Sequence, residues 1–279
     1  MKILKTMTTL AFACACLFTF AGCDWFGNSG TLIAEPTDTQ LNLISGAVAN
    51  MEAYTGDYTI TASEEENFYS SADYLPSGTV TGTMVERRKG TGDSMVGYQK
   101  TTITEKSESI NVQTTYTGTE EKYIGKVGEE YLSLDLTDQT KRTYTTMEAL
   151  ISSTGIGVLE IQESELLDDL TGYTTDELQI YALSEDDTSF RIVLTSTTYD
   201  EDLEENSTNK YVSTFEATLI TVNGTLLFST FEENTLIYER ENTTDSWGEL
   251  NGKRYFLYNY DYSSMSIVLP DATNYEEDI

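Results

Sequence analysis

The sequence predicts a mainly β fold, an α+β arrangement in which antiparallel strands dominate and helices are few. Three observations support this prediction. Apolar and polar residues alternate with a period of two through most of the chain, and these runs are rich in the strand-favouring residues Thr (44) and Tyr (19). Asn-Gly pairs, a strong signal for a tight hairpin, fall between strand-like runs. Helical periodicity occurs only near the N-terminus and in the middle of the chain.

The composition excludes several classes of function. The 279 residues contain no His, which excludes Ser-His and Cys-His catalysis and imidazole zinc sites. All three Cys lie within the first 23 residues, so the rest of the chain forms no disulfide. A formal charge of −31 repels nucleic acid. Because the chain also has no Gly-rich phosphate loop, no GxSxG motif and no HExxH motif, we expect no cofactor, no metal and no enzymatic activity.

The N-terminus is typical of a secretory signal. A short basic segment, Met1–Lys5, precedes the mostly apolar stretch Thr6–Phe20, and Ala21, Gly22 and Cys23 follow. The apolar stretch is shorter than the roughly 20 residues of a transmembrane helix. Ala21-Gly22-Cys23 resembles the lipobox of bacterial lipoproteins, although Phe20 stands where that family usually has Leu.

The lipobox resemblance implies a signal peptide over residues 1–22 and an acylated Cys23. It places the protein on the extracytoplasmic face of a cell membrane, held there by lipid. The alternative is an ordinary signal peptide cut nearby, which would leave Cys23 as a lone thiol. Cleavage before Cys23 removes two Lys and no acid, so the mature chain carries a net charge of −33. This acidity suggests a saline habitat or a cation-rich surface, and general acidity of the source proteome explains it at least as well.

Downstream of Cys23 we expect three regions. Residues 23–35 form a flexible tether, residues 36–270 form one β-rich domain, and residues 271–279 form an acidic tail. The domain opens with a helix that starts at Pro36 and Thr37 and stops near Gly56. Its predicted apolar face consists of Leu41, Ile44, Val48 and Met51.

Strands are predicted in two series, separated by a helical insert over Met147–Leu170. The acidic, aromatic stretch Ser63–Gly78 is interpreted as a long loop. The predicted strands of the first series are Asp57–Ala62, Thr79–Arg88, Met95–Lys106, Ser109–Thr117, Lys122–Val127, Glu130–Leu136 and Lys141–Thr145. The predicted strands of the second series are Leu178–Leu183, Ser189–Thr198, Lys210–Val222, Thr225–Glu232, Leu236–Glu241, Trp247–Leu250 and Lys253–Tyr262. Met265–Leu269 follows them and leads to Pro270.

Two hairpin turns are predicted in the second series, at Asn223-Gly224 and at Asn251-Gly252, because both turn positions require a positive φ. Pro270 is expected to end the ordered chain, and Glu276–Asp278 to fray. In the insert, Met147, Leu150 and Ile151 form one short apolar face. A second apolar face of the insert consists of Leu159, Leu166, Leu167 and Leu170.

This order of elements resembles the bacterial lipoproteins built on the LolA/LppX-type half-open β-barrel. The resemblance rests on the helix-to-strand run Ile44–Thr61, the hairpin Lys122–Leu132 ahead of the insert, and the ending Tyr258–Pro270, which it implies is an edge strand closing on Pro. It implies a large curved antiparallel sheet whose concave face is covered by the N-terminal helix and a two-helix insert. It also implies a cavity for a lipid or another amphiphile, and it transfers no ligand-contacting residue position by position.

Side chains that share one face of the second-series strands are the candidates for such a cavity. The alternative interpretation of the same alternation is a fully packed core with Tyr hydroxyls at its rim. The candidate ligand-cavity residues are Phe190, Ile192, Leu194, Tyr211, Phe215, Leu219, Phe228, Tyr258 and Tyr260.

The densest acidic run, Asp200–Asn206, has acids at positions one, three and five of a calcium loop. Glu205 stands where such a loop needs Gly and Tyr211 where it needs Glu, so we interpret the run as an acidic hairpin tip. Paired carboxylates suited to glycoside hydrolysis arise by chance among 47 acids, and no spacing here is diagnostic.

The leading hypothesis is therefore a non-enzymatic, lipid-anchored protein that binds or carries an amphiphile. The second hypothesis is an interaction module with a packed interior that binds another envelope protein. A glycan-binding or hydrolytic protein is the third.

Overall fold

The computed structural model describes residues 30–68, 77–109, 112–159, 170, 174, 177–201, 204–248 and 250–277. The predicted signal peptide, Cys23 and most of the predicted tether lie outside these residues. Among the residues described, no helix is both long enough and apolar enough to cross a membrane.

The first helix, α2 (Asp38–Glu52), forms where the apolar periodicity predicts it. A capping box starts it: the Thr37 hydroxyl accepts a hydrogen bond from the backbone N–H of Gln40 at 3.3 Å, and the Gln40 side-chain oxygen accepts from the backbone N–H of Thr37 at 3.0 Å. The helix ends at Ala53, a few residues before the predicted stop at Gly56. Its buried residues are Ile44, Ala47, Val48 and Met51.

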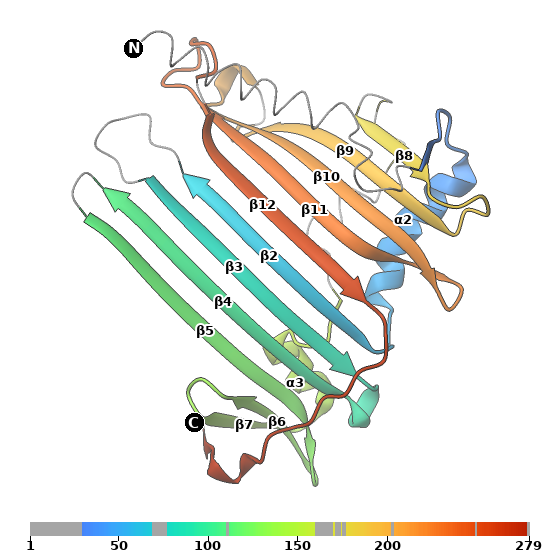
Figure 1. Cartoon of the computed structure of the whole chain (residues 1–279), viewed down its shortest axis with the longest axis vertical. Helices are drawn as coiled ribbons and strands as arrows, with labels where there is room; N and C mark the ends of the chain where they lie inside the picture. The colour runs from blue at the N-terminus through green and yellow to red at the C-terminus, as the bar shows by residue number, and fades with distance from the viewer. Residues whose placement is uncertain are drawn as a thin grey trace.

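Thirteen strands form one sheet in the order β1-β8-β9-β10-β11-β12-β2-β3-β4-β5-β6-β7-β13. Neighbouring strands are antiparallel except β13 and β7, which are parallel. The sheet is open, because β1 and β13 stand at its two ends (Figure 1). The predicted mainly β fold with an N-terminal helix is thus confirmed. The strands are β1 (Thr31–Leu32), β2 (Tyr58–Phe68), β3 (Ser77–Lys89), β4 (Val96–Ser109), β5 (Val112–Val127), β6 (Glu130–Asp135), β7 (Thr140–Tyr144), β8 (Leu178–Ala182), β9 (Ser189–Tyr199), β10 (Asn209–Val222), β11 (Thr225–Glu239), β12 (Leu250–Asp261) and β13 (Glu276–Glu277).

The two strand series meet at one pair of strands, β12 and β2. This pairing runs from Gly252 opposite Phe68 to Asp261 opposite Thr59. It joins the meander β2–β7 to the meander β8–β12 in one continuous sheet (Figure 1).

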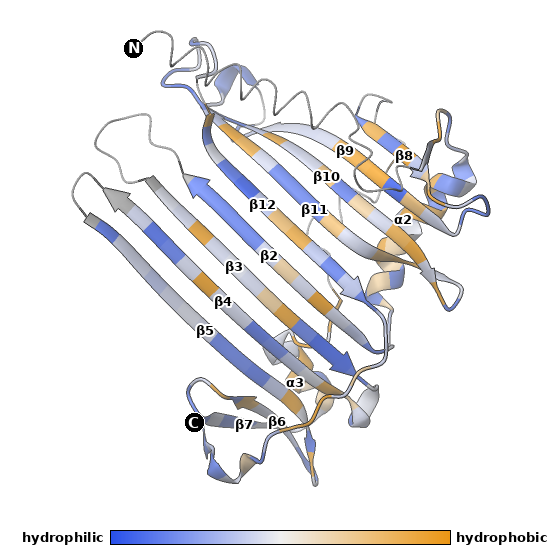
Figure 2. Cartoon of the chain, in the orientation of Figure 1, coloured by the Kyte–Doolittle hydropathy of each residue, from blue (hydrophilic) through white to orange (hydrophobic). Residues whose placement is uncertain are grey.

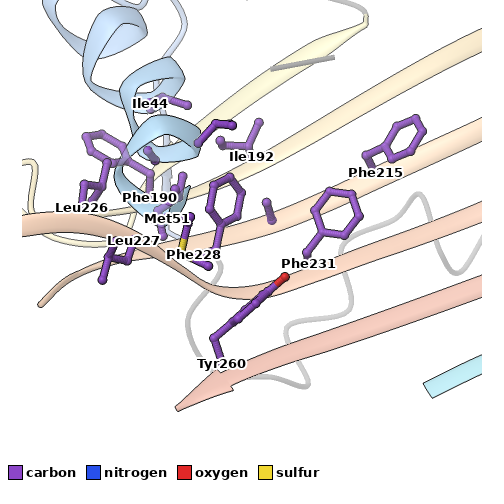
Figure 3. Packing of buried hydrophobic residues seen from close by; sticks show 14 of the residues in the cluster. Ile44, Met51, Phe190, Ile192, Phe215, Leu226, Leu227, Phe228, Phe231 and Tyr260 are labelled. Atoms are coloured by element: carbon purple, nitrogen blue, oxygen red, sulfur yellow. The ribbon is translucent and has the colours of Figure 1, made fainter. Parts of the chain in front are cut away.

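The main core lies between α2 and the strands of the second series. Figure 3 shows Ile44 and Met51 of α2 directed at Phe190, Phe228 and their neighbours on the sheet. The strands β9 and β10 contribute alternate side chains, as expected for a sheet with one buried face. The strand β11 instead contributes three successive residues, Leu226–Phe228, followed by Phe231. Leu159 and Leu170 of the insert are buried in the same core.

The insert begins with a second helix, α3 (Met147–Thr154), which contacts β5, β6 and β7. It lies on the same face of the sheet as α2, because Tyr58 belongs to the main core and also reaches the residues that hold the loop after α3. The predicted second helix around Leu166 and Leu167 lies outside the described residues. Met95, Ile124, Met147, Leu150 and Ile156 form a smaller core under α3.

The predicted loop over Ser63–Gly78 is wrong at both ends. Ser63–Phe68 continues β2, and β3 already begins at Ser77. The acidic residues of this stretch fit a strand because Arg254 on the neighbouring β12 places Nη2 2.9 Å from Oε1 of Glu66. This cross-strand ion pair compensates the charge of Glu66, an acidic residue that by itself suggests a loop.

One of the two predicted Asn-Gly hairpins forms. Asn223 and Gly224 have φ values of 52° and 84° and connect β10 to β11. The second prediction is wrong, because Asn251-Gly252 lies inside β12. The register between β11 and β12 shifts after Ile237, which makes Asn251 the extra residue of a β-bulge. A Cβ on Gly252 would lie 3.2 Å from Cδ1 of Ile237, so this glycine serves a close approach between strands.

Three predicted strand limits also need correction. The predicted strands Ser109–Thr117 and Lys122–Val127 are one strand, β5, and the predicted strands Thr225–Glu232 and Leu236–Glu241 are one strand, β11. Trp247 precedes β12 and stacks on Tyr199, with ring centroids 5.8 Å apart. Because long neighbouring strands pair along their whole length, polar residues that locally suggest a break remain in the sheet.

The chain after β12 differs from the prediction of a closing strand followed by a frayed tail. Met265–Leu269 is not a strand; Leu269 crosses over β5 at Gly125, where a Cβ would lie 2.7 Å from Cδ1 of Leu269. β13 then pairs with β7, and Nζ of Lys141 lies 2.9 Å from Oε1 of Glu277. The C-terminal segment is therefore attached to the first half of the sheet (Figure 1).

The outer halves of β4 and β5 form a single sheet layer. From Gln113 to Thr117 every side chain is exposed, although successive side chains point to opposite faces, so both faces contact solvent. Figure 2 shows that most of this region is polar. Its strands are linked by hydroxyl pairs, such as Thr104 with Thr117 at 3.2 Å.

Candidate functional site

The structure brings the predicted cavity residues together but packs most of them. Seven of the nine are buried in the main core with α2, Tyr258 packs at its margin, and Tyr211 is half-buried on β10 outside it. None of the nine lines either of the two pockets described below. Their role as a ligand cavity therefore stays a prediction. The seven packed residues are Phe190, Ile192, Leu194, Phe215, Leu219, Phe228 and Tyr260.

The larger pocket lies at the other end of the molecule, beside α3, and has a volume of about 660 Å³. Its apolar lining comes from Met95, Met147, Ile151 and Val158, with Tyr131 at one side. The charged residues that line it are Arg88, Asp93 and Glu148, and its remaining lining residues are Gly92, Thr146 and Ser152. The volume falls within the range of small-molecule sites, about 300–1,000 Å³.

Local sequence signals shape this pocket. Thr146 caps α3 by accepting a hydrogen bond from the backbone N–H of Ala149 at 3.1 Å. Gly155 ends the helix in the left-handed conformation, with φ of 70°, and so turns the chain back towards the sheet. The short helix η1 (Gly92–Ser94) forms the facing wall. The predicted apolar face of α3 supplies two of the lining residues, Met147 and Ile151, but no signal in the sequence indicates a pocket there.

Gly157, in the loop after α3, is held by two side chains of β3. Its backbone N–H donates to Oε1 of Glu86 at 3.0 Å, and its carbonyl oxygen accepts from Nη1 of Arg88 at 2.9 Å. With φ of 93°, and with Met95 Cε 3.0 Å from where a Cβ would be, this position requires glycine. The three residues, named the Gly157 clamp below, fix the insert against the sheet.

The Glu86 carboxylate of the clamp is almost fully buried and fully hydrogen-bonded. Oε1 also accepts from the Tyr58 hydroxyl at 2.7 Å, and Oε2 accepts from the Gln99 side-chain amide at 3.0 Å. Burial raises the pKa of Glu86 above its ordinary value, and the hydrogen bonds and the nearby Arg88 oppose that rise. Burial, followed by the charge of Glu86, raises the pKa of the Tyr58 hydroxyl, which therefore remains a hydrogen-bond donor.

Arg88 is the cation of the pocket. Its Nη1 is shared between the carbonyl oxygens of Gly157 and Tyr54, at 2.9 and 3.3 Å. Its Nε is buried and has no hydrogen-bond partner within the described part of the chain. A buried donor without a hydrogen-bond partner is unusual in folded proteins.

The rim of the pocket carries a small polar network. The Tyr131 hydroxyl donates to Oδ1 of Asp93 at 2.8 Å, and Nζ of Lys126 lies 3.1 Å from Oδ2 of Asp93. These hydrogen bonds lower the pKa of Asp93 and raise that of Lys126. Lys126 also lies over the Tyr131 ring, 4.8 Å from its centroid, so the network holds the ring as a wall of the pocket.

A second, smaller pocket of about 220 Å³ lies between β2 and β12. Glu65, Asn67, Lys253 and Tyr255 line it, so one carboxylate and one aromatic ring face it. Glycoside hydrolysis needs a pair of carboxylates at such a cleft, and this pocket has only one.

The acidic run 200–206 acts as a turn anchor at the residues that are described. Asp200 accepts hydrogen bonds from the backbone N–H groups of Thr208 and Asn209, at 3.0 and 3.1 Å, which lower the pKa of its carboxyl. In the described parts of the chain, no three or more acidic side chains gather in a metal-binding arrangement.

Comparison with known proteins shows only distant likeness. No protein-family model and no curated protein sequence matches the chain. A solved structure on lipid–protein interactions in lipovitellin is 6% identical, with a TM-score of 0.37 over 77% of this chain and 26% of that chain. The chain thus spans about a quarter of that lipovitellin chain. A porin-like protein from Bacteroides uniformis is 9% identical, with a TM-score of 0.23 over 72% of this chain and 96% of that one. Likeness at this level carries no functional argument.

Proposed function

We propose that this chain is a non-enzymatic, extracytoplasmic lipoprotein that binds an amphiphile in the pocket beside α3. The pocket itself is the observation that carries the proposal: it has a volume of about 660 Å³ and an apolar lining, with Arg88 among its lining residues. The proposed ligand site therefore differs from the predicted cavity, whose residues are mostly packed under α2. It is the pocket beside α3 and the smaller core.

The binding mechanism is burial of an apolar chain. Each CH₂ group transferred from water to the apolar lining contributes roughly 0.8 kcal/mol. A polar head group remains at the rim, where Arg88 offers a donor and Asp93 and Glu148 offer acceptors. A neutral or zwitterionic head group fits this mixture of charges better than a purely anionic one.

Binding is tested with a dansyl-labelled acyl amine titrated into the full chain, prepared as Cys23→Ser so that no anchor lipid is carried along. We expect a saturable rise in fluorescence at one probe per chain. Ile151→Trp, which fills the pocket, lowers the affinity at least about tenfold, because the larger side chain takes the space of the acyl chain. Ile103→Trp is the matched control, since Ile103 is exposed on β4 away from the pocket.

Two results would contradict the proposal. One is the lack of saturable binding by the unsubstituted pocket. The other is an equal loss of affinity in Ile151→Trp and Ile103→Trp, which would place the probe elsewhere on the molecule.

The membrane anchor rests on the lipobox resemblance and needs its own test. We expect the full chain to incorporate labelled palmitate and to sediment with membranes, and we expect Cys23→Ser to lose the label. Cys16→Ser is the control and keeps it. Labelling of Cys23→Ser would contradict the assignment of the acylation site.

The second candidate is an interaction module that binds another envelope protein. The packing of seven predicted cavity residues in the main core favours it, because that interior holds side chains where a carrier would hold lipid. If the acyl amine does not bind in the pocket, the interaction module becomes the better candidate for the function.

A further inference from the structure

The longest unpaired sheet edge among the described strands belongs to β5. β4 pairs with β5 from Val112 to Ile124, whereas β6 pairs with it only from Lys122 to Val127. The outer side of residues 112–118 therefore has no strand neighbour in the described structure. The terminal strands β1 and β13 are two residues long, so they offer no comparable edge.

The backbone groups that point outward from this edge can be identified. The carbonyl oxygen of Thr119 accepts a hydrogen bond from the Thr137 hydroxyl, and the backbone N–H of Glu121 donates a hydrogen bond to the same hydroxyl. Thr119 and Glu121 therefore direct these backbone groups away from β4. Because backbone groups alternate between the two sides of a strand, the outward groups further along belong to Gln113, Thr115 and Thr117. These are the groups that an added strand would bond.

The edge lacks the features that usually prevent strand addition. No charged residue occurs from Ile110 to Thr119, although the chain carries 47 acids and 16 bases. The pairing of β5 with β4 shows no register shift, so no bulge bends the edge away. Charges, prolines and bulges are the common protections of exposed edges. Tyr116, 66% exposed, adds a large apolar surface at the centre.

We propose that two copies of this chain pair through their β5 edges, as antiparallel strands related by a two-fold axis at Tyr116. In this register Thr115 of each copy lies opposite Thr117 of the other, in a hydrogen-bonded pair. Tyr116 lies opposite its own counterpart, in a non-hydrogen-bonded pair with the two Cα atoms about 4.5 Å apart. The two sheets then continue into one.

Charge and edge geometry select a second copy as the occupant. The two-fold arrangement places Glu120 of each copy opposite Val112 of the other, so no acids face each other where the strands touch. Elsewhere the acidic surfaces repel, which leaves this uncharged stretch as the place where two copies can approach. The other uncharged run of unpaired edge in the described strands, Ser196–Tyr199 of β9 beyond the end of β8, is shorter than residues 112–118 of β5. The second copy therefore presents the same β5 edge, and the assembly closes at a dimer.

The pairing is tested by symmetric cross-linking of the full chain. Tyr116→Cys brings two thiols together across the axis, so mild oxidation yields a reducible dimer in most of the protein. Ile103→Cys is the matched control, because Ile103 is also an exposed apolar residue of this sheet but lies one strand inside, opposite Gly118. We expect at least about tenfold less cross-linking from it. Both variants also carry Cys14, Cys16 and Cys23, so versions with Ser at all three positions check that the dimer forms through position 116.

A second variant separates strand pairing from chance collision. Thr117→Pro removes an outward N–H and no backbone hydrogen bond to β4, although it also removes the hydroxyl pair with Thr104 on β4. The chain should still fold, while the Tyr116→Cys dimer falls at least about fivefold. Circular dichroism verifies that the fold is kept. Equal cross-linking at positions 103 and 116, a dimer unaffected by Thr117→Pro, no dimer, or a Tyr116→Cys adduct with a different protein would each overturn the proposal.

Discussion

At the residue scale, the Gly157 clamp shows how a buried carboxylate organises a site that it does not line. Glu86 accepts three hydrogen bonds, one each from β2, β4 and the insert, and its partner Arg88 borders the pocket. A charge with this environment is costly to bury but more costly to leave without its partners. The clamp therefore couples the position of the insert to the shape of the pocket wall.

Two substitutions of Glu86 separate its role as a hydrogen-bond acceptor from its role as a charge. Glu86→Ala leaves the Tyr58 hydroxyl and the Gly157 N–H without an acceptor, at about 1–3 kcal/mol each, so we expect a loss of about 3–5 kcal/mol in the free energy of unfolding. Glu86→Gln keeps an oxygen for both donors, and Gln99 can turn its amide to match, so its loss stays below about 1.5 kcal/mol. Urea denaturation measures both. Equal losses would show that the hydrogen bonds are not what Glu86 contributes.

The raised pKa of Glu86 also predicts how the free energy of unfolding depends on pH. Since the folded protein raises the pKa of Glu86 above its ordinary 4.5, folding favours the protonated carboxyl. The contribution of Glu86 to the free energy of unfolding is therefore greatest at low pH, and it falls as pH rises from 4.5 through the raised pKa. Relative to the unsubstituted chain, Glu86→Gln should gain stability with rising pH across that window. A difference that stays constant with pH would contradict the raised pKa.

At the element scale, the sequence predicts α2, the start of α3 and one of the two Asn-Gly turns, whereas it misplaces the limits of several strands. Thr37, the apolar spacing of α2 and the Asn223-Gly224 turn are local signals, and all three are confirmed. The extension of β2 through Glu64–Glu66 and the bulge at Asn251 depend on β12 and β11, neighbours that no local pattern reveals. Strand limits are set by partners distant in sequence, and so is the pocket, which is built from β3, η1, β6 and α3.

The cap of α2 provides a test at this scale. Thr37→Ala removes the hydroxyl that accepts from Gln40, and we expect a loss of about 1 kcal/mol in the free energy of unfolding. Thr37→Ser retains the acceptor and should lose only a few tenths of that. Thermal unfolding followed by circular dichroism compares the two. A Ser variant as unstable as the Ala variant would mean that the methyl group, rather than the cap, stabilises the helix start.

At the scale of the whole molecule, net charge should govern the response to salt. The formal charge of −31 produces repulsion within the fold, and raising the salt from 0.1 M to 1 M shortens the Debye length from about 10 Å to about 3 Å. We expect the Tm at pH 7 to rise by several degrees over that range. Near the pI of about 4.1 the rise should vanish. Calorimetry at both pH values separates this electrostatic effect from a general effect of salt, which would act equally at the two.

The pairing of β12 with β2 has a consequence for the order of folding. Each meander is built from contacts between successive strands, so loops of modest length close within it. The pair that joins the meanders brings together Thr59 and Asp261, near opposite ends of the chain. As a chain emerges from its N-terminus during synthesis, β2 must wait with one edge unpaired until nearly the whole chain has followed. The slowest step of folding should therefore be the docking of two preformed half-sheets, and destabilising β12 should slow it more than destabilising β4.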